Sequence, residues 1–584
     1  MAWTRWMMAA LAASMLGGAA PAAAQGFVHR EGKQIVDAEG RPLLLRGMGL
    51  GGWMLQEGYM LELGGLEKGQ QHVIRRRITE LVGEEKAAAF YRAWLDNFTT
   101  KADIDAMARW GFNSVRLPMH YNLFTLPIER EPVAGRDTWI EDGFARVDRL
   151  LEWTRANNMH LILDLHAAPG GQGNDLPISD RDPAKPSLWE SAENRRKTVA
   201  LWKKLAERYA NEPGIAAYDV LNEPNWDFDG PKQGHGCTSK ANVQLWDFYR
   251  EVIAAIRSVD RNHMIIIEGN CWGNNYGGLD APLDANSALS FHKYWNRNDR
   301  VSIEGHLALR DKLDLPLWLG ETGENSNTWF RDAIALVEGE GIGWAWWPLK
   351  KIRYNNPLQV NANPGWHALV AYWLGKGPKP SGAAAEAALM RLATHDVRYA
   401  NNLQHPDVID AMFRQPHTNA TLAFKANRIG RAGGRIAAVD FDLGRAGYAY
   451  WDREDANYHV ATGAERVTWN SGTTYRNDGV DIAVDAKGAP YVTSVQAGEW
   501  LQYTVDAEQA GVRSLSVRAR GGAGGTLSLA VNGRAPVSIA IPAGSAWTTV
   551  RFAGVELMQG RNRLVLKADS CTDCEIDSLA FADK

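Results

Sequence analysis

Two hydrophobic patterns follow one another along this chain. Up to about residue 375, short and almost continuously apolar runs alternate with segments whose apolar residues recur every three or four positions. The runs are typical of strands buried on both faces of a parallel sheet, and the spaced segments are typical of amphipathic helices. We predict eight such strands, at residues 43–46, 114–117, 161–165, 217–221, 264–267, 289–292, 317–320 and 343–347.

The helical pattern is clearest at residues 242–259, where Leu245, Tyr249, Val252 and Ile256 share one face. Eight alternating strand and helix units predict an α/β fold, a (β/α)8 TIM barrel over residues 25–375. A doubly wound open sheet is the alternative. It is disfavoured because no glycine-rich phosphate turn follows the first predicted strand.

The pattern changes after the barrel. Residues 376–430 look like a linker or bridging segment that leads into a helix. Over residues 431–584, short alternating segments lie between Gly, Asn and Asp turns, which predicts an all-β sandwich of jelly-roll type. Its expected strands are residues 435–441, 500–505, 514–519, 526–531, 537–541, 548–552 and 563–566.

The first 24 residues have the features of a secretory signal peptide. Arg5 gives a positive start, an apolar run follows, and Ala22–Ala24 forms a small-residue cleavage site. A membrane anchor is disfavoured because the run is short and rich in Ala and Gly. With no other apolar run near the length of a membrane span, we expect a secreted or periplasmic protein.

The net charge and the aromatic content limit the classes of binding partner that we expect. The formal net charge is −4, so we expect no nucleic-acid partner, and we expect a monomer. Tryptophan is in excess, with 24 Trp against 17 Tyr and 15 Phe. Flat indole rings suit the apolar faces of sugars, but a Trp-rich core would give the same count, so both interpretations stay open.

The four cysteines predict two disulfides in an exported protein. Cys571 and Cys574 form a CxxC pair, and Cys237 and Cys271 lie far upstream. We expect bonds 571–574 and 237–271. A zinc site is disfavoured because no histidine lies near the CxxC pair.

Polar and aromatic residues end most of the predicted barrel strands, where active sites of this fold lie. Two of them, Glu223 and Glu321, belong to strands on facing sides of the barrel mouth. Paired carboxylates are what glycoside hydrolysis needs, with no metal or other cofactor. Two structural carboxylates paired with Arg and His are the alternative. The other strand-end residues are Arg116, His166, Asn222, His292, Tyr294, Trp346 and Trp347.

The motifs RLP, DLH, LNEP, FHKY, GET and the final Trp pair, in this order, resemble glycoside hydrolase family 5, the cellulase-like family. The resemblance implies that Glu223 is the general acid/base and Glu321 the nucleophile. It implies that Asn222 binds the sugar 2-hydroxyl, and that Arg116 and Tyr294 keep Glu321 ionised. His166 and His292 would line the subsite at the cleaved bond, Trp347 would stack on its sugar, and Trp346 is the less favoured neighbour. Trp226, beside LNEP, stays open between a sugar platform and loop packing.

The electrostatics expected from these neighbours agree with the two roles. A cation and a phenol beside Glu321 would lower its pKa, whereas Glu223, close to that negative charge, would have its pKa raised. A retaining mechanism also requires the two carboxyl groups to lie about 5–5.5 Å apart, against ~6.5–9.5 Å in inverting enzymes.

The C-terminal segment resembles carbohydrate-binding module family 6. The matching pieces are YRNDGVDI at 475–482, AGEWLQYTV at 497–505, SLSVRAR at 514–520, SAWTTV at 545–550 and EIDSLAF at 575–581.

The module departs from that family at its functional positions. Ser494 stands where an aromatic platform is usual, and Glu575 stands where a sugar-binding Asn is usual. The paired acids that help bind a structural calcium appear as Ala437 and Val439, with Asp440 left. Two interpretations stay open: Trp547 with Tyr491 binds glycan, or the module only stabilises the enzyme. A structural calcium in this module is a further hypothesis.

Together these features predict a retaining β-glycoside hydrolase that cleaves β-glucan, of cellulase or endoglucanase type. The loop HAAPGGQ at 166–172 keeps β-1,3-glucanase activity open, as the resemblance does for other β-glycans and glycolipids. A non-catalytic carbohydrate-binding protein is the alternative from another class. It is disfavoured because Glu223, Glu321, Arg116 and Tyr294 are all present.

Overall fold

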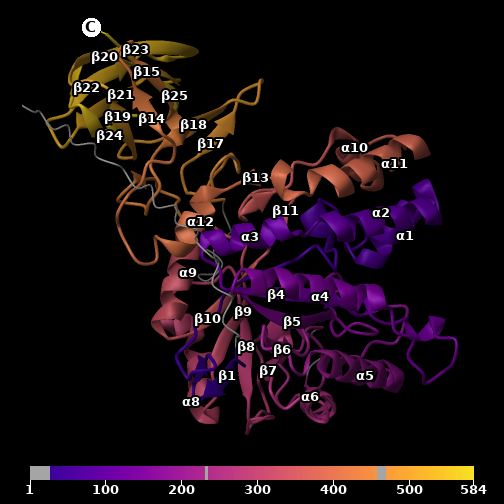
Figure 1. The fold of residues 1–584 in the computed structure, drawn as a ribbon. Coiled ribbons are helices and arrows are strands. Elements are labelled where there is room, and N and C mark those ends of the chain that lie inside the picture. The colour runs from indigo at the N-terminus through magenta and orange to yellow at the C-terminus, as the bar shows by residue number, and fades with distance from the viewer. Residues whose placement is uncertain (1–25, 231–233, 457–467, 584) are drawn as a thin grey trace, which may run out of the picture.

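The structure, a computed structural model, describes residues 26–230, 234–456 and 468–583 (Figure 1). The expected signal peptide at residues 1–24 lies outside the described residues. Within the described part of the chain, none of the helices combines the length and the apolar content that crossing a membrane requires.

Eight parallel strands close into a barrel in which each strand pairs with its sequence neighbour and the last pairs with the first. The predicted (β/α)8 barrel is therefore confirmed. The strands are β3 (Arg46–Gly49), β4 (Ser114–His120), β5 (His160–Ala167), β6 (Ile215–Asp219), β7 (Met264–Glu268), β8 (Ser287–Lys293), β9 (Leu317–Gly323) and β10 (Gly343–Trp347).

The first barrel strand lies three residues beyond its predicted position. The apolar residues of 43–46 include Leu45, which is fully buried in a small core with Val28 and Ile35 from the β1–β2 hairpin (His29–Glu31, Gln34–Val36). The strand itself begins at Arg46 and contains Gly47 and Gly49. A Cβ at Gly49 would lie 2.6 Å from the ring of Trp347, which is a steric clash. Glycine is therefore required at a position where the strand pattern predicts an apolar side chain.

Helices surround the barrel because each buries one apolar face against the strands. The predicted helix at 242–259 is confirmed as α6 (Val243–Arg257), with Leu245, Tyr249, Val252 and Ile256 fully buried. The other large helices of the barrel are α1 (Gln71–Val82), α2 (Glu84–Asn97), α3 (Lys101–Trp110), α4 (Glu141–Ala156), α5 (Ala192–Tyr209), α8 (Glu304–Leu313) and α9 (Asn327–Gly339).

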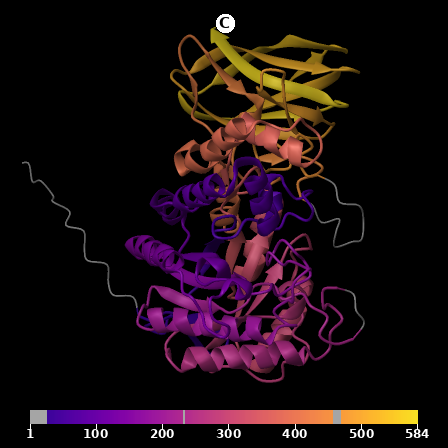
Figure 2. The ribbon, with the colours of Figure 1, turned by 90° about the vertical axis from the view of Figure 1, so that its right-hand side faces the viewer.

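The segment after the barrel is folded and lies between the barrel and the C-terminal sandwich (Figures 1 and 2). After α10 (Pro364–Trp373) it forms α11 (Gly382–Arg391) and α12 (Pro406–Phe413). Leu389 and Met412 are buried in the same hydrophobic core as the barrel. Residues 382–413 therefore pack on the barrel domain, whereas Asn427–Ile429 already pair with the sandwich.

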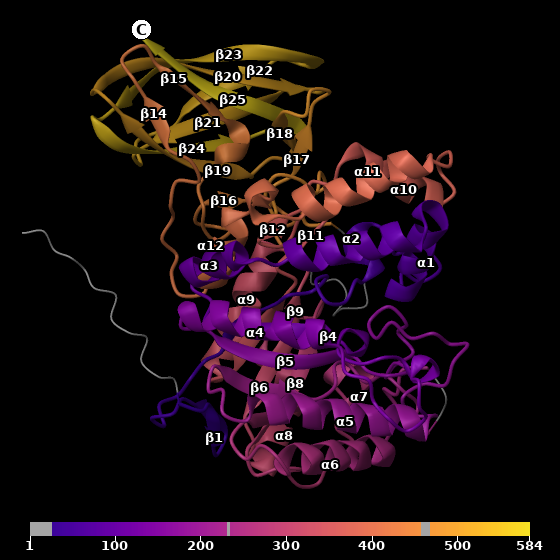
Figure 3. The ribbon, with the colours of Figure 1, turned by 45° about the vertical axis from the view of Figure 1, so that its right-hand side comes forward.

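The C-terminal domain consists of two sheets, and the predicted all-β sandwich is confirmed (Figure 3). Among the described residues one sheet contains β14 (Asn427–Ile429), β16 (Tyr450–Trp451), β19 (Trp500–Ala507), β21 (Gly525–Val531), β22 (Val537–Ile541) and β24 (Gly560–Ala568). The other contains β15 (Gly434–Ala437), β17 (Ile482–Val484), β18 (Pro490–Val495), β20 (Gly511–Gly521), β23 (Gly544–Leu557) and β25 (Cys574–Asp583). The strand expected at 435–441 ends at Ala437, where a 3-10 turn begins.

A buried polar contact joins the sandwich to the barrel. The backbone N–H of Asn327, at the start of α9, donates to the carbonyl of Asn477 at 3.0 Å. The side-chain amide of Asn327 donates to Asp407 of α12 at 2.8 Å and to Asp478 at 3.0 Å. All four residues are at most 2 % exposed, so these hydrogen bonds fix the two domains to each other.

Candidate active site

A cavity of about 740 Å³ opens at the carboxyl ends of the barrel strands. Six of the predicted site residues line it: Glu223, Glu321, His166, His292, Tyr294 and Trp347. Further walls come from loops, with Trp272 and Trp295 among them. Its size is that of a small-molecule site.

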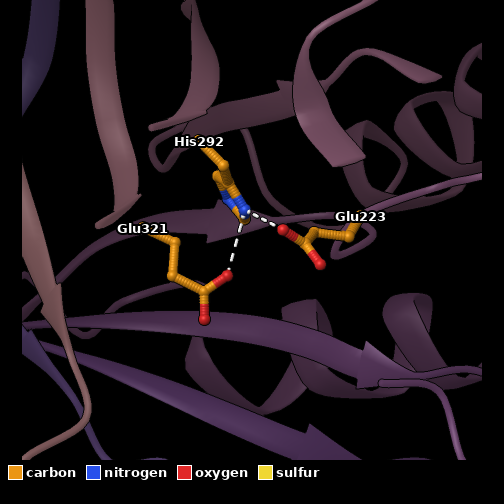
Figure 4. A group of neighbouring side chains, drawn as sticks. All are labelled: Glu223, His292 and Glu321. Carbon is orange, nitrogen blue, oxygen red and sulfur yellow. Dashed lines mark hydrogen bonds and ion pairs between the residues drawn. The ribbon is translucent and has the colours of Figure 1, made fainter. Parts of the chain in front are cut away.

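His292 lies between the two glutamates (Figure 4). Its Nδ1 atom is 2.6 Å from Glu223 Oε1 and 3.0 Å from Glu321 Oε2. One carboxylate oxygen of each glutamate and one His292 nitrogen all lie within 4.8 Å of one another. The two carboxylates therefore face a common space, and this closeness fits the short separation of a retaining pair better than that of an inverting pair.

Glu321 is held in its ionised form. It is 4 % exposed, and burial by itself would raise its pKa. The positive charges of His292 and Arg116 outweigh burial and lower the pKa below its ordinary value, with Arg116 Nη1 at 3.9 Å from Glu321 Oε1. Tyr294 lines the same cavity without a hydrogen bond to Glu321, so cations rather than the tyrosine supply this stabilisation.

Glu223 is the protonated partner. Burial raises its pKa to about 7, and the charges of Glu321 and Glu268 add to that effect against the opposing His292. Its backbone has a φ of 43°, in the left-handed region that residues other than glycine rarely adopt. The backbone N–H of Glu223 donates to Glu268 at 2.7 Å, which stabilises this conformation.

Arg116 is fully buried and serves several acidic residues at once. Its Nε donates to Asp219 at 2.9 Å, and its Nη2 donates to Glu268 at 3.0 Å and to the side-chain oxygen of Asn222 at 2.8 Å. Its closest contacts are therefore beneath the glutamate pair. Arg116 orients Asn222 through a hydrogen bond, and its positive charge, 3.9 Å from Glu321, lowers the pKa of that carboxyl group.

His166 and Trp347 form a flat wall of the cavity. Their rings stack with centroids 5.1 Å apart and planes 5° apart. Asp164 accepts from His166 Nδ1 at 2.7 Å, and its charge overcomes burial to raise the pKa of His166 to about 10. The indole N–H of Trp347 donates to the Tyr59 hydroxyl at 2.9 Å. These contacts hold the indole in a fixed orientation at the cavity wall.

Two predicted aromatic contacts lie away from this cavity. Trp346 is 1 % exposed and packs against Trp329, Phe330 and Trp344, because adjacent residues of a strand point to opposite faces. Trp226 is covered by the guanidinium of Arg181, 5.0 Å from its ring centre. The assignment of Trp346 to the sugar site is therefore corrected to packing, and Trp226 lies outside the residues that line this cavity.

Several site residues escaped the sequence prediction. Glu268 ends the fifth barrel strand and follows the same strand-end rule as Glu223, so the signal was present in the motif IIIEGN. Glu57 and Tyr59 line the cavity from the loop after the first strand, where no periodic pattern marks them. Burial raises the pKa of Glu57 to about 7.

The basic pair after the eighth strand is buried. Lys350 is 0 % exposed and donates to Asp103 and to the Phe98 carbonyl. Lys351 is 8 % exposed and forms an ion pair with Glu324 at the cavity wall.

The Glu223, His292 and Glu321 cluster is also the one group of three His, Cys, Asp or Glu side chains in the described residues with metal-ligand spacing. Its imidazole does not suit a metal. Although burial opposes it, the surrounding carboxylates raise the pKa of His292 well above its ordinary value, so both ring nitrogens carry protons. The cluster fits acid–base chemistry better than metal binding.

The predicted binding residues of the module come together on one side of its second sheet. Tyr491 and Trp547 meet edge to face at 5.4 Å, and Glu575 forms an ion pair with Arg520. The guanidinium groups of Arg518 and Arg520 lie 4.7 Å and 4.6 Å from the Trp547 ring centre. The indole is thus partly covered by cations.

Asp440, the acid left near the calcium position, has hydrogen-bond and ion-pair partners within the protein, and all four cysteines are in disulfides. Asp440 accepts from the Tyr475 hydroxyl at 2.5 Å and pairs with Lys425 at 3.0 Å. Disulfides join Cys237 to Cys271 and Cys571 to Cys574.

A closed (β/α)8 barrel with two facing glutamates of opposite protonation at its strand ends defines this protein as a glycoside hydrolase. The model of the cellulase family, glycosyl hydrolase family 5, matches residues 77–351 of its barrel domain. The model of carbohydrate binding module family 35 matches residues 476–571.

This second match corrects the predicted module family from 6 to 35. The pieces that carried the resemblance fall largely within β19, β20, β23 and β25. Strand patterns of that kind specify a β-sandwich and do not separate one sandwich family from another. The expectation of a carbohydrate-binding module stands.

Three curated relatives match the chain over much of their own length. A beta-xylosidase of Phanerodontia chrysosporium is 27 % identical, over 60 % of this chain and 76 % of that protein. A probable glucan 1,3-beta-glucosidase A of Emericella nidulans is 28 % identical, over 55 % and 74 %. Endoglucanase C of Acetivibrio thermocellus is 25 % identical, over 45 % and 88 %.

Proposed function

We propose that this protein is a retaining β-glycoside hydrolase that cleaves β-glucan, with Glu321 as the nucleophile and Glu223 as the general acid/base. The observation that carries the proposal is the glutamate pair itself. An oxygen of each carboxylate lies within 4.8 Å of the other, and the two pKa values are moved in opposite directions.

The geometry supports a double displacement. Ionised Glu321 attacks the anomeric carbon, while protonated Glu223 donates its proton to the departing glycosidic oxygen. Glu223, now a carboxylate, takes a proton from water, and the resulting hydroxide displaces Glu321 from the sugar. His292, within 3.0 Å of both carboxylates, donates hydrogen bonds that balance the negative charge as it moves between them.

The remaining side chains bind and orient the sugar. Trp347, held by Tyr59 and stacked on His166, is the platform beneath the ring at the cleaved bond. Asn222, held by Arg116, is assigned to the 2-hydroxyl. The choice of β-glucan is supported by relatives named endoglucanase and glucan 1,3-beta-glucosidase.

The test is hydrolysis by the wild type, Glu223→Gln and Glu321→Gln on β-1,4- and β-1,3-glucans and on β-xylan oligosaccharides. We expect glucan cleavage by the wild type, with a first-formed product of β configuration, and loss of more than about a thousandfold in kcat in both variants. Glu251→Gln, an exposed glutamate on α6, is the matched control and should retain full activity. Undiminished turnover in either site variant, or an α-configured first product, would overturn the mechanism.

We also propose that the enzyme is exported. The N-terminal pattern and the two disulfides support this proposal, since disulfides persist in oxidising compartments. Cell fractionation with an activity assay tests it, and enzyme found only in the cytoplasm would contradict it.

A further inference from the structure

A second cavity, of about 560 Å³, adjoins the catalytic one. Tyr59 and Trp295 line both cavities and therefore mark the place where the two meet. The second cavity lies beyond the Trp347 platform, because Tyr59 is the residue that accepts the Trp347 indole N–H. A chain bound across the glutamates has room to continue into this space.

The walls of the second cavity come from both domains. The barrel supplies the loop after β11 (Lys350–Lys351), including Arg353 and Tyr354. The C-terminal module supplies Thr468 and Trp469. The rings of Tyr354 and Trp469 approach to 6.2 Å between centroids, so an aromatic pair lines the space where the two domains meet.

Trp469 is fixed with respect to the catalytic strand. Its indole N–H donates to the side-chain oxygen of Asn477 at 3.3 Å. The amide of Asn477 donates in turn to the Asn325 carbonyl at 2.8 Å and to Asn327 at 3.0 Å. Asn325 and Asn327 lie just beyond β9, the strand that carries Glu321. Buried hydrogen bonds thus connect the module's indole with the nucleophile's loop.

We propose that the C-terminal module completes the substrate cleft, and that Trp469 and Tyr354 form a distal subsite for a glucosyl ring of the same glucan chain. This inference rests on the proposed function. The volume is that of a small-molecule site, and aromatic faces with a polar rim suit a sugar ring. The rim here is the ion pair of Glu62 and Arg353, 3.3 Å apart, which can exchange hydrogen bonds with hydroxyl groups.

The test compares substrates that reach the distal subsite with one that does not. Glucan oligosaccharides of two to six residues and a short aryl β-glucoside are assayed with the wild type, Trp469→Ala and Tyr354→Ala. We expect kcat/KM of both variants to fall about 3- to 10-fold on the longest oligosaccharides, mainly through KM. On the aryl glucoside, which occupies only the catalytic cavity, we expect no change.

Trp451→Ala is the matched control, since Trp451 is a module tryptophan, 46 % exposed, outside both cavities. It should leave every substrate unaffected. If Trp469→Ala does not fold, Tyr354→Ala decides the question from the barrel side.

Two results would overturn the subsite. One is an equal fall on long and short substrates, which would mean that the aromatic pair only holds the domains together. The other is full activity of both variants on the longest oligosaccharides. Failure of the proposed function looks different, because the wild type would then cleave neither glucan nor aryl glucoside.

Discussion

The carboxylate of Glu268 accepts a hydrogen bond from the backbone N–H of Glu223 at an N···O distance of 2.7 Å. Glu268 also contacts Arg116 at 3.0 Å and His292 at 3.1 Å. It therefore touches the backbone of the proposed acid, the cation beneath the site and the imidazole between the two glutamates. A residue that meets no sugar can in this way set both the position and the pKa of Glu223.

We predict that Glu268→Gln moves the alkaline limb of the pH–activity profile to lower pH. The negative charge of Glu268 contributes to the raised pKa of buried Glu223, so its removal lowers that pKa and deprotonates the acid earlier. We expect a shift of about one pH unit and a fall in kcat of roughly tenfold. The measurement is kcat/KM against pH, and an unmoved alkaline limb would show that Glu268 is only structural.

The wild-type profile should be bell-shaped. Activity should fall as the pH rises through about 7, where Glu223 loses the proton that it must donate. On the acid side activity should persist below the ordinary range of glutamate, because the pKa of Glu321 is lowered. Glu57 has a pKa of about 7 as well, so Glu57→Gln is the control. Loss of the alkaline limb in that variant would assign it to Glu57.

Substitutions of the adjacent residues Trp346 and Trp347 should affect different properties, stability in one case and activity in the other. Trp347→Ala removes the proposed platform beside His166 and should lower kcat/KM by about 10- to 100-fold, with a smaller loss of unfolding free energy than Trp346→Ala because the Trp347 ring lines the cavity. Trp346→Ala leaves a void among buried aromatic rings and should lower the free energy of unfolding by about 3–5 kcal/mol. Denaturant unfolding and steady-state kinetics of both variants test this, and the opposite assignment of effects would refute it.

Asn477→Ala should weaken the junction between the domains. It removes the amide that donates to Asn325 and Asn327 and the oxygen that accepts from Trp469. Leaving buried polar groups without partners should lower the free energy of unfolding by roughly 1–3 kcal/mol. Asn211→Ala, at an exposed asparagine, is the control and should be neutral. Equal unfolding midpoints for the two variants would mean that the junction does not stabilise the protein.

The barrel could be predicted from sequence because strands buried on both faces must be apolar throughout. That rule fails at β3 (Arg46–Gly49), where the backbone passes so close to Trp347 that glycine replaces the expected apolar residues. In the sandwich, β18 (Pro490–Val495) was missed. Its pairing with β25 shifts register beside Ser494, which has a φ of 54° and interrupts the alternation that marks a strand.

The two glutamates could be located because the ends of barrel strands converge on one mouth. Glu268 follows the same rule and was accessible to it. Tyr59 and Trp469 were not accessible in this way, since one lies in an irregular loop and the other in a different domain. Such residues reach the cavity only through tertiary folding, so no local spacing in the sequence predicts their position there.

The hydrogen bonds that Asn327 makes with Asp407 and Asp478 limit how this enzyme can be re-engineered or recombined. Modular glycan-degrading enzymes invite the exchange of one appended domain for another at a linker. A chimaera that replaces the chain after residue 430 would lack Asn477 and Asp478. Asn327 and Asp407 of the barrel domain, both buried, would then lose the hydrogen bonds that these residues make with them. The barrel and its module should therefore be exchanged together, because their interface residues depend on one another.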